Sequence, residues 1–264
     1  MLVAVGGGSW VRWNPHAESA PTRSEDALPL PPPPVRLSDD PQYDRCLDML
    51  ADDPRGSAAL AEAWEAQGGG EAARHCAALA MLALGEAERA APRLEQIGRA
   101  SEAGATARAA VFGQAAQAWM IAGAPQRAYG AVTVALSLAP DDADLLIDRA
   151  VASGVLGRYG EALQDLDQAL RLAPDRADAL VFHAAAARHL DRPAVALADL
   201  ERALAIDPDS PEALLERGIL KQMGGDAAGA RADWERAITL APDSPTADLA
   251  AQNIALNEAG PRRN

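Results

Sequence analysis

The chain of 264 residues has few aromatic side chains, two cysteines, no excess of positive charge and no long apolar run. Its 38 acidic residues outnumber its 24 lysines and arginines, and no third of the chain carries a net positive charge. Because nucleic acids and anionic membrane surfaces need a basic surface to bind, neither is expected as a partner. No segment approaches the roughly 18 consecutive apolar residues of a transmembrane helix, so no membrane span is predicted.

Motifs that would indicate catalysis or metal binding are also missing. The sequence contains no HExxH, paired CxxC, GxSxG, GxGxxG or phosphate-binding GxxxxGK[ST] pattern. The four histidines are scattered: His16 is near the start, His75 is alone, and His183 and His189 are six residues apart, so they share no helical face. The sequence therefore predicts no enzyme, no metal site and no cofactor.

A regular internal repeat dominates what is present. Pro140, Pro174, Pro208 and Pro242 are equally spaced and stand in the segments LAPDD, LAPDR, IDPDS and LAPDS. Proline ends a helix, and the Asp or Ser that follows caps the next one. Within each unit, apolar residues recur at helical spacing in two stretches that a Gly- or Asp-bearing turn separates. Each unit is therefore predicted to be an antiparallel helix pair.

Small residues recur at positions 8, 20 and 27 of each unit, where closely packed helices need them. Position 8 holds Ala116, Ala150, Ala184 and Gly218, position 20 holds Ala128, Ala162, Ala196 and Ala230, and position 27 holds Ala135, Ala169, Ala203 and Ala237. Bulky residues, namely Val132, Leu166, Leu200 and Trp234, fill position 24. This pattern resembles the bacterial tetratricopeptide repeat. The resemblance implies an all-α superhelix of about five to six antiparallel helix pairs with a concave groove.

The repeat also predicts the boundaries along the chain. Residues 1–40 are rich in Pro, Ser, Gly and acidic residues and are expected to be a disordered tail, with a polyproline II stretch near 29–34. Residues 41–108 are predicted to hold two degenerate pairs, with a four-residue insertion before Ala109. The regular units are 109–142, 143–176, 177–210 and 211–244. Residues 245–260 are expected to form a capping helix, and 261–264 a disordered end.

The resemblance implies that residues on the first helix of each unit face the groove. Position 5 holds Ile147, Val181 and Leu215, position 9 holds Val151, Ala185 and Ile219, and position 13 holds Val155, His189 and Met223. Positions 2 and 6 hold Asp144, Asp178 and Glu212, and Asp148, Phe182 and Glu216, while Arg188 stands at position 12. We expect an exposed apolar ladder rimmed by carboxylates.

Such a groove suits a neutral or basic peptide or amphipathic helix with aliphatic anchors. The function predicted is a non-catalytic protein-interaction scaffold. Relatives that grip the acidic ends of chaperones carry basic groove residues, which this chain largely lacks, so an acidic peptide terminus would be repelled. One alternative is a homo-oligomeric assembly factor of the bacterial envelope. Another is an enzyme accessory or sensor that uses His183, Arg188 and His189, although position 7, where His183 stands, normally faces the core.

Cys46 and Cys76 admit two interpretations. They are either two buried free cysteines or a disulfide between the first helices of successive pairs, which are neighbours in a stacked array. A disulfide requires an oxidising compartment. As written, the chain lacks an exported leader and is expected in the cytoplasm; if its true start encodes a leader, it is periplasmic.

Overall fold

The computed structural model describes residues 37–259, which form thirteen α-helices and no strand. The bounds of the helices are α1 Pro41–Asp48, α2 Pro54–Ala66, α3 Gly70–Ala83, α4 Ala87–Ala100, α5 Ala105–Ile121, α6 Pro125–Leu138, α7 Ala143–Val155, α8 Tyr159–Leu172, α9 Ala177–His189, α10 Pro193–Ile206, α11 Pro211–Met223, α12 Ala227–Leu240 and α13 Pro245–Ala259. This architecture confirms the predicted all-α fold class. None of these helices is both long and apolar enough to cross a membrane.

Local sequence signals set the helix ends. Asp142 caps α7 by accepting hydrogen bonds from the backbone N–H groups of the first turn, and Ser210 caps α11 in the same way. The turn within each regular pair contains one residue with positive φ, such as Gly157 at 75°. Only the third regular pair uses another residue there, Asp191 at 57°. Asp tolerates this left-handed conformation better than most residues with a side chain, so the turn keeps its shape.

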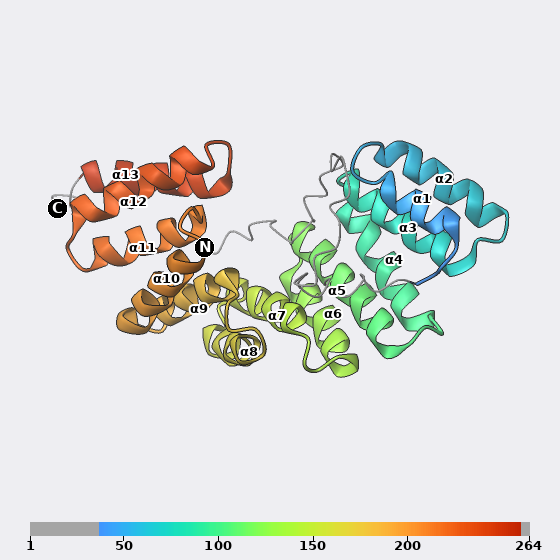
Figure 1. Cartoon of the computed structure of the whole chain (residues 1–264), viewed down its shortest axis with the longest axis horizontal. Helices are drawn as coiled ribbons and strands as arrows, with labels where there is room; N and C mark the ends of the chain where they lie inside the picture. Colours follow the sequence, from blue (N-terminus) through green and yellow to red (C-terminus); the bar gives the residue numbers. More distant parts are fainter. Residues whose placement is uncertain (1–36, 260–264) are drawn as a thin grey trace, which may run out of the picture.

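The helices stack along an arc, with α1–α4 at one end and α11–α13 at the other (Figure 1). Each helix packs against the next one in the chain. In addition α5 contacts α7, α7 contacts α9 and α9 contacts α11. Direct contact between alternate helices is expected on the shorter, inner side of a curved array. The first helices of the pairs therefore form the inner layer, which confirms the predicted superhelix.

The predicted small positions lie where helices approach most closely. Ala150, Ala184 and Ala162 are almost completely buried. Gly218 in α11 is packed so tightly that a Cβ atom there would overlap the indole ring of Trp234 in α12. The Trp234 ring is itself buried and donates a hydrogen bond to the carbonyl oxygen of Leu215, 3.2 Å away. In the last regular unit, the absence of a side chain at Gly218 therefore leaves the space that the ring of Trp234 at position 24 occupies.

In the last three regular units, the residue at position 26 bonds to the unit before. Gln168, Arg202 and Arg236 each donate a side-chain hydrogen bond to the carbonyl oxygen of the proline that precedes their own unit, at 3.3, 3.4 and 3.0 Å. The acceptors are the equally spaced Pro140, Pro174 and Pro208. The same prolines thus end one helix and provide the anchor for the next pair.

One predicted feature is placed by the structure and one predicted boundary needs correction. Helix α5 begins at Ala105, so the four residues inserted before Ala109, 105–108, add a turn to the start of this helix. Ala is the strongest helix former, and Arg108 donates to the carbonyl oxygen of Gly98, 3.0 Å away, which holds this extra turn against α4. The tail prediction ends too late: Leu37 packs against the core and Asp40 caps α1. The rest of the expected tail, residues 1–36, and the expected disordered end, 261–264, lie outside the described residues.

Candidate functional site: the inner face of the superhelix

The inner face is built from α5, α7, α9 and α11, and its apolar residues differ sharply in exposure. Ile147, Val181 and Leu215 at position 5 are only 5, 7 and 8% exposed, because neighbouring inner helices cover them. Ala185 at position 9 is also buried, and Val151 and Ile219 are half-buried. The expectation of a fully exposed ladder was therefore wrong for position 5.

Position 13, in the last turn of each inner helix, is the exposed part of the ladder. Val155 is 36% and Met223 58% exposed, and His189 is exposed between them. Ile121 stands at the same position of the first regular unit and is 57% exposed. Ile121 was not among the predicted groove residues, although it precedes Val155 by one full repeat. We call Ile121, Val155, His189 and Met223 the position-13 row.

His189 has an aromatic partner in the row. Its ring stacks parallel on Tyr159, at the start of α8, with 4.1 Å between the ring centroids. Partial burial lowers the pKa of His189, and the neighbouring positive charge of Arg188 lowers it further. At neutral pH the ring is therefore uncharged and continues the apolar surface between Val155 and Met223.

The carboxylates beside the ladder are largely engaged. Arg176 forms ion pairs with Asp144 of the preceding inner helix and with Asp178 of the following one. Burial alone would raise the pKa of Asp178, but the hydrogen bonds from Arg176 hold it below its ordinary value. Arg188 binds Glu216 through two hydrogen bonds of 2.9 and 3.3 Å.

Two further acidic residues accept hydrogen bonds from neutral side chains. Thr246 of α13 donates to Glu212 at 3.1 Å, and Gln117 of α5 donates to Asp148 at 3.1 Å. Burial raises the pKa of Asp148 to about 7; the hydrogen bond from Gln117 opposes this shift, and the charge of Asp144 adds to it. The face therefore retains negative charge, but less than its sequence suggests. The role of Arg176 was missed because it stands at the end of a unit, where only helix capping was considered.

Phe182, the remaining predicted groove residue, lies half-buried at position 6 of α9. Its unit thus places an aromatic ring where the neighbouring units place Asp148 and Glu216. The acidic rim is interrupted at the middle repeat.

His183 belongs to a structural ion pair. Its Nδ1 is 2.7 Å from Asp199 of α10, and its Nε2 is 3.4 Å from Asp167 of α8. The corresponding residues of the neighbouring units, Arg149 and Arg217, pair with the corresponding aspartates of α8 and α12. His183 therefore fills the core position that its register predicted. No group of His, Cys, Asp or Glu within residues 37–259 is arranged to hold a metal ion.

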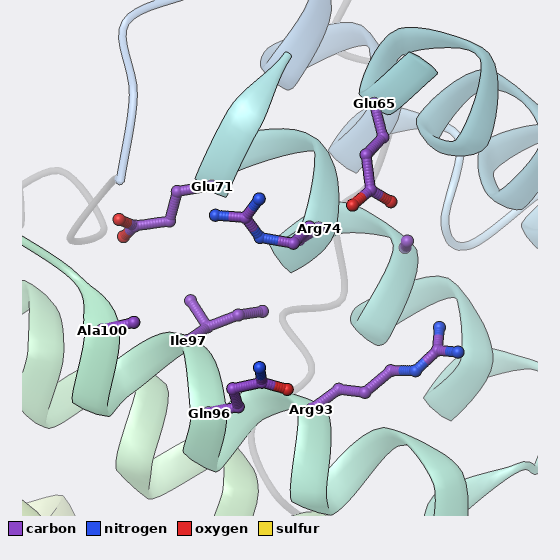
Figure 2. A pocket seen from close by; sticks show the side chains of 8 residues that line it. Glu65, Glu71, Arg74, Arg93, Gln96, Ile97 and Ala100 are labelled. Carbon is purple, nitrogen blue, oxygen red and sulfur yellow. The ribbon is translucent and has the colours of Figure 1, made fainter. Parts of the chain in front are cut away.

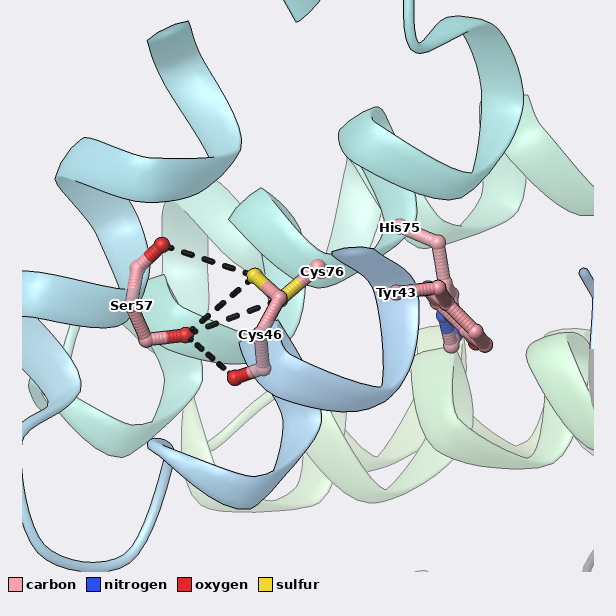
Figure 3. The surroundings of a disulfide bond; sticks show 5 residues. All are labelled: Tyr43, Cys46, Ser57, His75 and Cys76. Carbon is pink, nitrogen blue, oxygen red and sulfur yellow. Dashed lines mark hydrogen bonds between the residues drawn. A yellow bond between two sulfur atoms is a disulfide. The ribbon is translucent and has the colours of Figure 1, made fainter. Parts of the chain in front are cut away.

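At the other end of the array, a disulfide joins Cys46 of α1 to Cys76 of α3, with 6.3 Å between the Cα atoms. Both cysteines are fully buried, and the hydroxyl of Ser57 donates to the carbonyl oxygen of Cys46 at 2.8 Å (Figure 3). Of the two interpretations of these residues, the structure contains the bonded one.

A buried hydrogen-bond chain runs beside this disulfide. His75 contacts Tyr43 of α1 through Nδ1, at 2.7 Å, and Gln114 of α5 through Nε2, at 2.6 Å. Burial lowers the pKa of His75 to about 4, against the hydrogen bond with Gln114, so the ring is neutral at pH 7. A neutral ring that donates to the Gln114 oxygen leaves Nδ1 to accept the Tyr43 hydroxyl proton. His75 therefore links three helices and has no free nitrogen for chemistry.

The geometry defines a helical-repeat protein whose first helices form the inner layer of an arc. A sequence model of the tetratricopeptide repeat matches residues 118–187 and 184–255, more than half of the chain. The chain belongs to the tetratricopeptide repeat family. Members of this family are generally non-enzymatic scaffolds for protein–protein interaction. No curated protein matches the sequence.

Solved structures show the same fold at low sequence identity. MamA 41-end from Desulfovibrio magneticus RS-1 is 19% identical, with a TM-score of 0.54, over 62% of this chain and 90% of that one. YrrB, described as a TPR protein with an unusual peptide-binding site, is 19% identical with a TM-score of 0.53, over 73% and 95%. The APC/C hetero-tetramer Cut9-Hcn1 is 14% identical with a TM-score of 0.65, over 80% of this chain and 42% of that one.

Proposed function

We propose that this protein is a scaffold that binds a neutral or basic peptide or amphipathic helix along its inner face, with the position-13 row as the apolar contact. The observation that carries the proposal is this row: apolar side chains recur on successive inner helices and stay exposed while the rest of the ladder is covered. Aliphatic anchors of a ligand gain most where exposed apolar area is covered on binding.

The negative charge of the same face favours a neutral or basic ligand over an acidic one. The face carries five acidic residues, Asp144, Asp148, Asp178, Glu212 and Glu216, and two arginines; Arg176 pairs with Asp144 and Asp178, and Arg188 pairs with Glu216. A basic side chain beside the row would meet residual negative charge, whereas an acidic one would be repelled. Binding should therefore weaken as salt is raised, because Asp144 and Asp178 are exposed to solvent.

The chain offers a matched control for the row. Leu172, Ile206 and Leu240, in the last turns of α8, α10 and α12, are 45, 44 and 38% exposed and also recur once per repeat, but they belong to the second helices of the pairs. The test compares Ile121→Glu, Val155→Glu and Met223→Glu in one variant with Leu172→Glu, Ile206→Glu and Leu240→Glu in another.

Peptides selected from a random library against the wild-type chain provide the ligands, and calorimetry measures their affinities. We expect the inner-row variant to lose at least about tenfold in affinity, which corresponds to about 1.4 kcal/mol, and the control variant to bind as the wild type does. Equal binding by both variants would exclude the row as the ligand site. Light scattering on the same samples separates the second candidate: if only self-association depends on the row, the face is an interface between copies of this chain.

A further inference from the structure

A pocket of about 350 Å³ lies at the N-terminal end of the array, between α2, α3 and α4. Figure 2 shows Glu65, Glu71 and Arg74 on one side of it and the side chains of α4 on the other. The α4 residues that matter for its chemistry are Arg93, Gln96 and Ile97. Its volume is at the lower end of the range of small-molecule sites, about 300–1,000 Å³. The pocket is separate from the position-13 row and does not depend on the function proposed for it.

Three of the four regular repeats hold an ion pair at this place, and the first, α5–α6, has Ala115 and Ala131 there. In the pairs α7–α8, α9–α10 and α11–α12, a cation at position 7 binds an aspartate at position 23 across the two helices. These pairs are Arg149–Asp165, His183–Asp199 and Arg217–Asp233. In the pair α3–α4 the same two positions hold Ala77 and Arg93, and both residues line the pocket. The α3–α4 pair therefore lacks the carboxylate and has a cation on the opposite helix.

The two arginines of the pocket lack the carboxylate partners that Arg149 and Arg217 have in the regular pairs. Among residues 37–259, neither Arg74 nor Arg93 forms an ion pair, and the Arg93 guanidinium donates only to the sulfur of Met81, at 3.3 Å. A thioether is a weak acceptor, whereas a guanidinium matches a carboxylate in a planar, bidentate geometry. Arg149 and Arg217 make that bidentate contact with their aspartates within this same chain. The amide of Gln96 adds neutral hydrogen-bonding groups beside Arg93.

The pocket also carries negative charge, on the same side as Arg74 (Figure 2). Glu65 enters from α2, the helix before this pair, and Glu71 stands at the start of α3. One oxygen of Glu71, Oε1, is buried without a hydrogen-bond partner. A buried acceptor without a donor is costly, so a ligand that brings an N–H group is favoured there. Two guanidinium groups and two carboxylates make the pocket neutral overall, with groups of both signs around it.

We propose that this pocket binds a free α-amino acid with an apolar side chain. Its carboxylate pairs with Arg93 as the aspartates of the regular units pair with Arg149 and Arg217, its ammonium group meets Glu65 and Glu71, and its side chain lies on Ile97 and Ala77. A ligand with only a carboxylate would leave the two glutamates to repel it, and a ligand with only an ammonium group would meet the arginines. A zwitterion satisfies both sides at once.

Calorimetric titration of the full chain with L-leucine tests the proposal. L-Leucine should bind, while N-acetyl-L-leucine, which lacks the ammonium group, and L-leucinamide, which lacks the carboxylate, should bind at least about tenfold more weakly. Glycine should also bind more weakly, because it leaves the apolar wall uncovered. Failure of L-leucine to bind at millimolar concentration, or equal binding of the two derivatives, would overturn the proposal.

Variants locate the binding. Arg93→Gln should weaken L-leucine binding at least about tenfold and leave the helical circular dichroism unchanged, since the Arg93 side chain is exposed and holds no helix in place. Arg89→Gln is the matched control, because Arg89 lies one turn earlier on α4, outside the pocket, and pairs with Glu86 at the surface. Binding that is unaffected by Arg93→Gln, or equally reduced by Arg89→Gln, would place the amino acid elsewhere.

Discussion

Removing the disulfide should unfold one end of the molecule and leave the rest intact. The perturbation is the double substitution Cys46→Ala and Cys76→Ala, which keeps two fully buried positions apolar. The bond closes a loop with a sequence separation of 30 residues. The chain-entropy relation for a loop of that length gives a stabilisation of about 3–4 kcal/mol.

Unfolding caused by removal of the disulfide should stay local, because each helix pair contacts only its neighbours in the array. Helix α1 has eight residues and contacts α2 and α3. In a stacked array, stability is the sum of each unit and its interfaces with its neighbours, so a terminal unit can unfold alone. The buried chain through Tyr43 and His75 would also be broken, because α1 supplies the tyrosine. We therefore expect residues 41–66 to open while α5–α12 keep their packing.

Hydrogen–deuterium exchange resolved by peptide is the assay for this prediction. Peptides from α1 and α2 should exchange at least a hundredfold faster in the double variant, and in the wild type with reductant, than in the oxidised protein; about 2.7 kcal/mol corresponds to that factor. Peptides from α9–α12 are the internal control and should not change. Unaltered protection in α1 and α2 would show that packing alone holds the first pair, and a loss of protection along the whole chain would refute the local character of the unit.

Three other predictions concern single positions. Hydrogen bonding to Asp199 raises the pKa of His183 above its ordinary value, so the ion pair stabilises the fold at low pH and this stabilisation is lost as the pH rises through the raised pKa. His183→Arg should remove this loss, which urea titrations at a series of pH values from 6 upward would measure, and parallel curves for the two proteins would contradict it. Gly218→Ala should destabilise by about 1–3 kcal/mol because the new methyl group overlaps Trp234, whereas Gly130→Ala, in an open helical site, should be neutral or stabilising by up to about 1 kcal/mol. Thermal unfolding that gives both glycine variants the same sign would refute the packing argument. The raised pKa of Asp148, about 7, means that stability falls as the pH rises from about 4 to 7, because the unfolded chain releases this proton first; Asp148→Asn should raise the melting temperature at pH 8 and not at pH 4.

The repeat architecture was predictable because each contact that stabilises one unit must recur in the next. Pro174 and Pro208 mark helix ends, and their carbonyl oxygens also accept the hydrogen bonds that join successive units. Small residues such as Ala150 are needed wherever two helices touch, so they recur with the same period. A period of this kind indicates the fold even though solved structures such as YrrB and Cut9-Hcn1 are only 19% and 14% identical to this chain.

The exposure of the inner face was not predictable in the same way. The register placed Ile147 and Val155 on the same side of α7, but how far neighbouring inner helices cover each one depends on the curvature of the array. The ion pairs across units were missed for a related reason. Arg176 reaches an aspartate of the preceding inner helix, 32 residues earlier, and no local pattern signals a contact at that separation. The packing between units, and not the helices themselves, is what the sequence leaves undetermined.

Departures from the period carry information that the period itself does not. A residue that follows the repeat is explained by packing, since all units share the same geometry. His183 replaces an arginine in the repeated ion pair and makes that one pair sensitive to pH. Arg93 stands where the last three regular pairs have an aspartate, and it lines an open, charged pocket. Packing alone would be satisfied by the same residue in every unit. Each of these two substitutions is therefore either neutral or serves a function specific to this chain. Measurements of pH dependence at His183 and of ligand binding at Arg93 distinguish the two explanations.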